Sequence, residues 1–160
     1  MDRVLLFDLD ETLMVEEPAA VASFEAAAKV AAAQRGIDPA RLALDARSRA
    51  RELWYAAPTH AYCKQVGISS WEGLWCRFES EGHEVRALRE WFPTYRREAW
   101  RLALADQGLD DPLLAEELGE HFARERRDRH EVFSDAEEAL RQLRGSYPLA
   151  TGTSSWRSRH

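Results

Sequence analysis

Two kinds of hydrophobic pattern follow one another along the chain. Residues 4–7 form a short, continuous apolar run, which is typical of a strand buried on both faces in a parallel sheet. A second strand is expected at residues 147–150, where an apolar run resumes after a long interval. Between the two runs, apolar residues recur with the spacing of amphipathic helices. The pattern therefore predicts an α/β chain in which two strands enclose a large helical segment.

Proline, glycine and capping residues place the ends of about seven helices. The expected helices cover residues 17–36, 38–55, 69–82, 94–108, 111–129 and 134–145, with a short segment before Gly67. Capping boxes at residues 69–72 and 134–137 begin two of them, since each has Ser at the first position and Glu at the fourth. Pro93 is expected to interrupt the pattern ahead of the helix that begins at Thr94.

Composition excludes several classes of function. The 160 residues suit one domain, or a small domain with an insertion, and the net charge of −6 argues against a general nucleic-acid surface. No apolar segment approaches the ~20 residues that span a bilayer, and residues 4–7 are too short for a signal-peptide core. Cys63 and Cys76 have no paired motif, so both are expected to be reduced thiols. A cytoplasmic protein without a membrane partner is predicted.

Two carboxylates follow the first predicted strand. Asp8 and Asp10 are two residues apart, so period-two geometry points both side chains to the same side. Ligands of open α/β sheets bind just beyond the carboxyl ends of the strands, which is where both residues fall. Like charges this close are costly unless a cation or a proton transfer uses them. The pair is therefore a candidate catalytic site, whereas a polar turn after a strand is the alternative.

These residues resemble the first motif of the haloacid dehalogenase-like superfamily. The motif is Asp-x-Asp-x-Thr, and the chain has the spelling common among the phosphatases, Leu-Phe-Asp-Leu-Asp-Glu-Thr-Leu, at residues 6–13. The resemblance implies that Asp8 is the nucleophile that forms an aspartyl-phosphate, and that Asp10 is the general acid and base. It also implies Mg²⁺ held by Asp8 and by the Asp10 backbone carbonyl, with a small phosphorylated metabolite as substrate. The alternative of a 2-haloacid dehalogenase is weaker, because Asp10 is a proton donor that a leaving halide does not need.

The order of elements resembles family members whose helical cap is inserted directly after the first motif. Residues 15–132 would be the cap, and residues 1–14 and 133–160 would form part of a Rossmann-like core with two parallel strands. Such a cap closes over the site, excludes water and selects the substrate. The aromatic residues between Trp54 and Trp100 are expected to form mainly the core of this cap, and a stacking platform for a base or an aromatic substrate is the alternative.

The second family motif is a strand that ends in Thr or Ser, whose hydroxyl and amide bind the phosphoryl group. Ungapped register in the segment Leu-Ala-Thr-Gly-Thr-Ser-Ser, residues 149–155, assigns Thr153 to this position. Thr151 or Ser154 could supply the hydroxyl instead, or the segment could be an ordinary loop.

The family's third and fourth motifs, a Lys and an acidic group, have no counterpart after Thr153. We therefore expect a truncated family member, either a fragment or a product whose reading frame shifts near Ala150. The competing hypothesis is a non-catalytic remnant or a helical interaction module. Sequence does not identify the substrate, because family membership predicts chemistry better than specificity.

Overall fold

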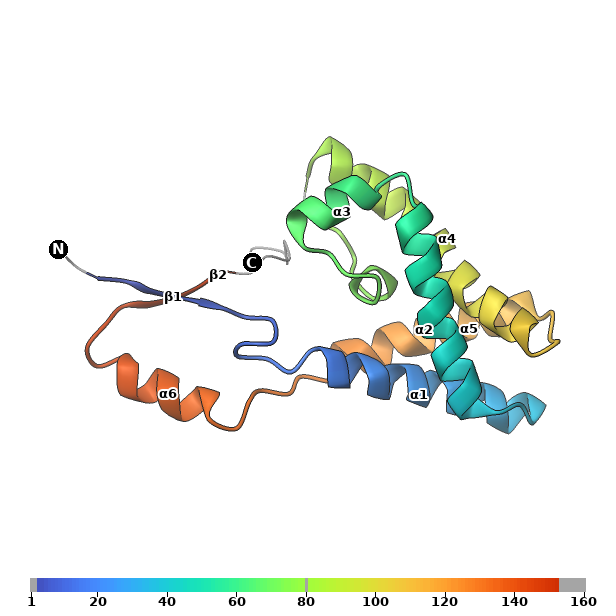
Figure 1. The fold of residues 1–160 in the computed structure, drawn as a ribbon, viewed down its shortest axis with the longest axis horizontal. Coiled ribbons are helices and arrows are strands. Elements are labelled where there is room, and N and C mark those ends of the chain that lie inside the picture. The colour runs from blue at the N-terminus through green and yellow to red at the C-terminus, as the bar shows by residue number, and fades with distance from the viewer. Residues whose placement is uncertain (1–2, 80, 153–160) are drawn as a thin grey trace.

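The computed structural model describes residues 3–79 and 81–152, and it divides visibly into a strand-containing part and a helical body (Figure 1). The strands β1 (Leu5–Asp8) and β2 (Leu149–Gly152) lie beside α6 (Ala136–Leu143) at the left of the figure. The helical body at the right contains α1 (Glu17–Arg35), α2 (Pro39–Ala56), α3 (His60–Val66), the 3₁₀ turn η1 (Glu72–Leu74), α4 (His83–Asp106) and α5 (Pro112–Asp128).

The two strands pair in parallel, as the sequence pattern predicts. The register runs from Leu5 opposite Leu149 to Asp8 opposite Gly152. Because the strands are parallel, their carboxyl ends lie at the same edge of the sheet. Asp8 and Gly152, which are opposite each other in the register, therefore lie at the same edge. The mostly helical chain with a parallel strand pair agrees with the α/β class.

Several predicted helix ends are confirmed. The Asp38 carboxylate accepts hydrogen bonds from the amides of Ala40 and Arg41 at 2.9 and 3.3 Å, and thereby caps α2. Asp111 caps α5 in the same way, with its Oδ1 3.0 Å from the Leu114 nitrogen. Gly36 ends α1 with a φ of +68°, a left-handed conformation that glycine adopts without steric cost.

The expected break at Pro93 is wrong, since α4 continues through it from His83 to Asp106. A proline inside a helix removes one backbone hydrogen bond and costs about 3 kcal/mol. Pro93 is exposed, whereas its neighbours Phe92 and Tyr95 are buried in the helical core. Packing on the buried side of α4 outweighs the local penalty on the exposed side.

The expected helix at residues 69–82 is also wrong in extent. The capping box itself forms: Glu72 Oε2 accepts from the Ser69 amide at 2.6 Å, and Ser69 Oγ accepts from the Glu72 amide at 3.3 Å. Only the 3₁₀ turn η1 follows it. Gly73 lies against the ring of Phe92, and Phe78 has a φ of +51°, which is incompatible with a continuing right-handed helix. Helical hydrogen bonds end with the Cys76 amide, which donates to the Glu72 carbonyl at 3.0 Å. Further along, Arg89 of α4 donates to the Phe78 carbonyl at 3.0 Å.

The second capping box does not form as expected. The helix α6 is present, but Asp135 is its N-cap residue and makes no side-chain capping hydrogen bond.

The core of the helical body lies between α1, α2, α4 and α5. It is one continuous cluster of buried residues that extends from Phe24 to Ala123 in the sequence. Most of the aromatic residues from Trp54 to Trp100 belong to it, which confirms the core interpretation for them. Those buried are Trp75, Phe78, Phe92, Tyr95 and Trp100, and those partly buried against the cluster are Trp54, Tyr62, Trp71 and Trp91. Tyr55, 63% exposed, is the exception among them.

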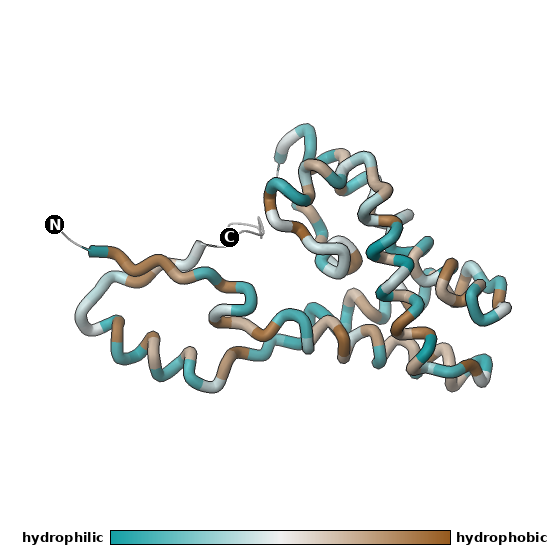
Figure 2. Tube along the Cα trace, viewed as in Figure 1, coloured by the Kyte–Doolittle hydropathy of each residue, from teal (hydrophilic) through white to brown (hydrophobic). Residues whose placement is uncertain are grey.

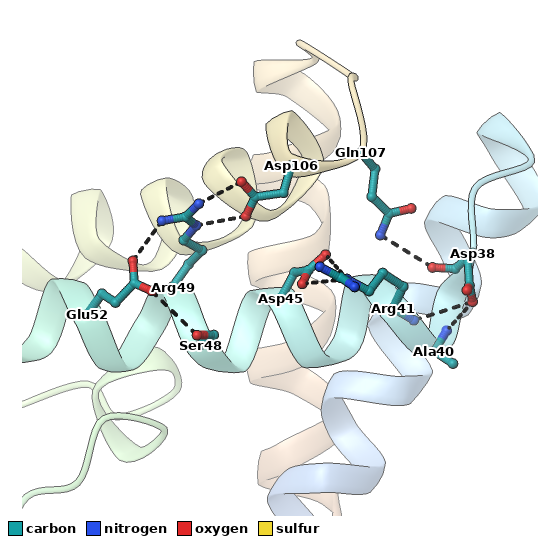
Figure 3. A network of polar contacts seen from close by, with 9 residues as sticks. All are labelled: Asp38, Ala40, Arg41, Asp45, Ser48, Arg49, Glu52, Asp106 and Gln107. Carbon is teal, nitrogen blue, oxygen red and sulfur yellow. Dashed lines mark hydrogen bonds and ion pairs between the residues drawn. The ribbon is translucent and has the colours of Figure 1, made fainter.

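Polar contacts along one side of α2 join it to neighbouring segments (Figure 3). Arg49 reaches Asp106 at the end of α4, and Arg41 pairs with Asp45 within α2. The Gln107 side chain donates to the Asp38 carbonyl at 3.5 Å, close to the start of α2. Two of these contacts, from Asp106 and from Gln107, join the C-terminal end of α4 to α2 and to the residue that caps it.

The strand pair is far less covered than the helical body. Leu6 and Val4 are 71% and 59% exposed, and most of β1 is brown in the hydropathy view of Figure 2. The helix α6 buries only Ala136. Within the described residues, the apolar surface of the sheet therefore has no layer packed over it. None of the described helices has the length and apolar character needed to cross a membrane.

Candidate functional site

The two candidate catalytic carboxylates stand where the sequence places them, at the carboxyl end of β1. Asp8 is the last residue of the strand and is exposed. Its Oδ1 accepts a hydrogen bond from the Leu9 amide at 3.0 Å, which fixes the rotation of the carboxylate. Asp10 follows two residues later, is partly buried and forms an isolated bridge with Met14.

A tight turn over residues 9–14 carries Asp10. The Leu9 carbonyl accepts from the amides of Leu13 and Met14, at 3.0 and 2.9 Å. The Glu11 amide donates to the Met14 carbonyl at 2.9 Å, so the turn is closed in both directions. Glu11 has a φ of +53°, in the left-handed region that side chains other than glycine rarely adopt. Asp10 is thus held on a hydrogen-bonded frame rather than on an open loop.

The chain enters and leaves the helical body through two neighbouring segments. The Val15 amide donates to the Glu131 carbonyl at 2.9 Å, and the Phe133 amide donates to the Leu13 carbonyl at 3.2 Å. Met14 and Val132 form an antiparallel bridge between them. Figure 1 shows the two segments side by side, one leading from β1 to α1 and the other from α5 to α6. The helical body therefore connects directly to the turn that carries Asp10.

Glu11 and Glu16 extend the turn into the helical body. The Glu11 carboxylate oxygen Oε1 accepts from the amides of Glu16 and Glu17, at 3.0 and 2.6 Å. The Glu16 carboxylate forms a buried ion pair with Arg126, near the end of α5. Neither glutamate was among the predicted site residues. Glu11 could have been noticed from sequence, because it follows Asp10 directly within the motif. Glu16 lies outside the motif.

An open hollow of about 600 Å³ lies between the turn and α1. Its lining residues are Glu11, Glu17, Pro18, Val21, Ala22 and Glu25. Asp8 and Asp10 are not among them, so the hollow is beside the carboxylate pair rather than around it. Its acidic and apolar lining differs from the cationic lining that phosphate alone would favour. The helical spacing of Glu17, Val21 and Glu25 could have indicated this face from sequence.

The residue expected to bind the phosphoryl group, Thr153, lies outside the described residues. Thr151, one of the alternatives, lies in β2 opposite Phe7 and is exposed. Ser154 is likewise outside the described part of the chain.

Whether Asp8 and Asp10 suit the expected Mg²⁺ depends on the donor atoms that they offer. Among the described residues, no group of three or more His, Cys, Asp or Glu side chains could hold a metal ion. Asp8 and Asp10 nevertheless offer the hard oxygen ligands that Mg²⁺ prefers. Mg²⁺ commonly keeps several waters and uses one or two carboxylates together with substrate phosphate. The donor types fit the ion, although the number of protein ligands is small.

Comparison with curated proteins finds a relative that is named a phosphatase. No family model matches the chain. The chain is 34% identical over 142 residues to a curated protein from Thermus thermophilus named phosphoserine phosphatase. The match covers 89% of this chain and 53% of that protein, so the chain spans about half the length of the relative. The name of this relative agrees with the resemblance of residues 6–13 to the first motif of haloacid dehalogenase-like phosphatases.

Proposed function

We propose that the chain contributes the nucleophile and the general acid of a phosphatase that hydrolyses a small phosphomonoester. The observation that carries the proposal is the placement of Asp8 and Asp10 at the carboxyl end of a parallel strand, on a closed turn. The similarity to a phosphoserine phosphatase extends over most of this chain and supports the same chemistry.

The reaction proceeds in two displacements. An Asp8 carboxylate oxygen attacks phosphorus, and the bond to the leaving alcohol oxygen breaks while Asp10 gives that oxygen a proton. Water then attacks the phosphorus of the aspartyl-phosphate. Asp10, now ionised, accepts the proton of the water, and the Asp8 carboxylate leaves with inorganic phosphate as the product. The hydrogen bond from the Leu9 amide orients Asp8 for both displacements.

The proposed metal ligands are the Asp8 carboxylate and Asp10. Bound there, Mg²⁺ would neutralise charge on the phosphoryl oxygens. Thr153 is proposed to contribute its hydroxyl and amide to the same phosphoryl group.

The substrate class follows from the hollow beside the turn. Glu11, Glu17 and Glu25 line it, and although Glu17 pairs with Arg47, the lining remains acidic. Such a lining favours a substrate with a cationic group next to its phosphate ester. Phosphoserine has an ammonium group in this position, and the relative carries that substrate in its name. We therefore take O-phosphoserine as the first substrate to test.

The proposed division of the chain places residues 1–14 and 133–160 in a Rossmann-like core and residues 15–132 in a helical cap. The neighbouring segments at Val15 and Glu131 support it, because the helical body is inserted between them. The buried cluster from Phe24 to Ala123 gives this cap a core of its own.

The decisive experiment traps the aspartyl-phosphate. The chain is incubated with O-phosphoserine or p-nitrophenyl phosphate, quenched, reduced with borohydride and mapped by mass spectrometry. Reduction is expected to label Asp8 alone, and Asp8→Asn is expected to abolish both the label and turnover. Asp10→Asn should slow O-phosphoserine, with its poor leaving group, more than the aryl ester. Turnover that survives in Asp8→Asn would contradict the covalent role.

A non-catalytic interaction module is the second candidate. The exposed strands favour it, because Val4 and Leu6 present apolar surface that another polypeptide could cover. The trapping experiment separates the two, since a module would acquire no label at Asp8. If the 160-residue chain shows none, the same assay on a chimera with the unmatched part of the Thermus phosphatase is the second arm. A chimera without Asp8-dependent turnover would exclude the enzyme.

A further inference from the structure

The first helix of the helical body is capped from outside. Glu16, at the N-cap position of α1, makes no side-chain capping bond, so the first amides need another partner. That partner is Glu11, whose Oε1 accepts from the amides of Glu16 and Glu17 at 3.0 and 2.6 Å. A carboxylate in this position is doubly favourable, because it fills the capping role and meets the positive end of the helix dipole.

Glu11 reaches these amides from an unfavourable backbone conformation. Its φ of +53° would suit glycine, which has no side chain to offer. The Glu11 amide is also engaged in the turn, donating to the Met14 carbonyl at 2.9 Å. One residue thus has its backbone in the turn of Asp10 and its carboxylate on α1.

The end of α1 that Glu11 contacts is itself firmly anchored. The carboxylate of Glu16 pairs with Arg126, and the two side chains are 5% and 1% exposed. Arg126 also donates to the Arg129 carbonyl at 2.9 Å, and its guanidinium lies 5.0 Å from the centre of the Trp75 ring. Because Trp75 belongs to the buried core of the helical body, the amides that Glu11 caps are connected to that core.

We infer that Glu11 is a positioning residue, which sets the position of Asp10, and of Asp8 just before its turn, relative to the helical body. The inference rests on the proposed function. Glu11 follows Asp10 in the chain, and its side chain is hydrogen-bonded to the start of α1. A displacement of α1 would therefore also displace the general acid Asp10. Conversely, any motion of the helical body over the site must either carry the turn with it or break the two hydrogen bonds of Glu11.

Three substitutions separate this role from others. Glu11→Gln keeps an acceptor oxygen but loses the charge, so the tether is expected to persist. Glu11→Ala removes the tether and keeps the strained φ, whereas Glu11→Gly removes the tether and relieves the strain. Glu116→Ala, an exposed change on α5, is the control for the loss of one surface charge.

The first measurement is amide hydrogen exchange at Glu16 and Glu17, which needs no turnover. Exchange should accelerate about fivefold in Glu11→Ala and Glu11→Gly, the equivalent of a lost helix cap. Exchange in Glu11→Gln and Glu116→Ala should stay close to that of the parent. Unchanged exchange in both Glu11→Ala and Glu11→Gly would overturn the tether, and the Gly variant gives this result even if the Ala variant folds poorly.

The second measurement is the split between kcat and KM with p-nitrophenyl phosphate, which has no ammonium group. A positioning role predicts that kcat falls about tenfold in Glu11→Gly while KM changes little, as for a misplaced catalytic group. A role limited to binding an ammonium would raise KM for O-phosphoserine alone, and would do so in Glu11→Gln as well. Accelerated exchange with an unchanged kcat would overturn positioning. Absence of Asp8-dependent turnover would instead remove the proposed function, whereas the exchange result would stand.

Discussion

Arg49 of α2 holds Asp106 at the end of α4 through two parallel hydrogen bonds (Figure 3). The distances are 2.7 Å from Nε to Oδ2 and 2.6 Å from Nη2 to Oδ1. The remaining guanidinium nitrogen, Nη1, donates to Glu52 at 2.7 Å. The hydrogen bonds from Arg49 lower the pKa of Asp106 below its usual value, and they raise the pKa of Arg49.

The stability of the helical body should therefore fall in acid. The pKa of Asp106 is lower in the folded chain than in the unfolded chain, so the pair stabilises the fold above the unfolded value of about 3.9. This contribution is lost as the pH falls through the lowered pKa. Urea denaturation at pH 6 and pH 3 is expected to show that Asp106→Asn is destabilising at pH 6 and less destabilising at pH 3. In an Arg49→Ala background this pH difference should become much smaller, because Arg49 is the main cause of the lowered pKa of Asp106. An undiminished difference would contradict the assignment.

Breaking the buried pair of Glu16 and Arg126 should be among the most damaging single changes. Arg126→Met keeps a long side chain but leaves the Glu16 carboxylate buried without its cation, which costs about 3–5 kcal/mol of unfolding free energy. The double variant Glu16→Gln/Arg126→Met should recover part of this loss. Urea unfolding followed by tryptophan fluorescence gives both values. A cost below about 1 kcal/mol for Arg126→Met would contradict the prediction, because that is the value of a solvent-exposed ion pair.

Magnesium binding by the chain should be weak. No group of three or more His, Cys, Asp or Glu side chains in the described part of the chain could hold a metal ion, so a dissociation constant of about 10⁻³ M is expected for Mg²⁺ alone. Isothermal calorimetry should detect this binding, and Asp8→Asn should remove it. A micromolar site would mean that a further carboxylate joins the pair, and Glu11→Gln would be the first variant to examine.

The strands should be much less stable than the helical body. Val4 and Leu6 are largely exposed, whereas the cluster between α1, α2, α4 and α5 is closely packed. Amides of β1 and β2 are therefore expected to exchange rapidly and those of the central helices slowly, with binding of an apolar dye and weak cooperativity on heating. A chimera that joins residues 1–148 to the unmatched part of the Thermus phosphatase should bind less dye and unfold cooperatively. A sharp thermal transition in the 160-residue chain itself would contradict this expectation.

Local signals in the sequence were sufficient for the strands and for most helix ends. Asp38, Asp111 and Gly36 act within one turn of the chain, so their effects are readable from spacing alone. The expected break at Pro93 and the expected helix at residues 69–82 were wrong, because contacts with distant parts of the chain decide both conformations. Tyr95 shows how this happens: its buried hydroxyl lies 3.0 Å from the Ala50 carbonyl and 2.6 Å from that of Ser70.

In the candidate site, too, residues specified by local sequence could be predicted, whereas those that depend on distant contacts could not. Asp8 and Asp10 could be predicted because a short motif after a strand specifies them. The part played by Glu11 could not, since it depends on a left-handed backbone and on amides five and six residues away. The pairing of Glu16 with Arg126 spans 110 residues, and no spacing rule links positions that far apart.

The hydrogen bond between Val15 and Glu131 has a consequence for protein engineering. Because the two ends of the helical body lie next to each other, a turn of a few residues could bridge them without altering the paths of β1 and α6. The closure entropy of such a short connection is small compared with that of the long segment it replaces. The whole body could therefore be excised, or exchanged for another with adjacent ends, in one genetic step. Substrate preference could then change while the turn that bears Asp10 keeps its sequence.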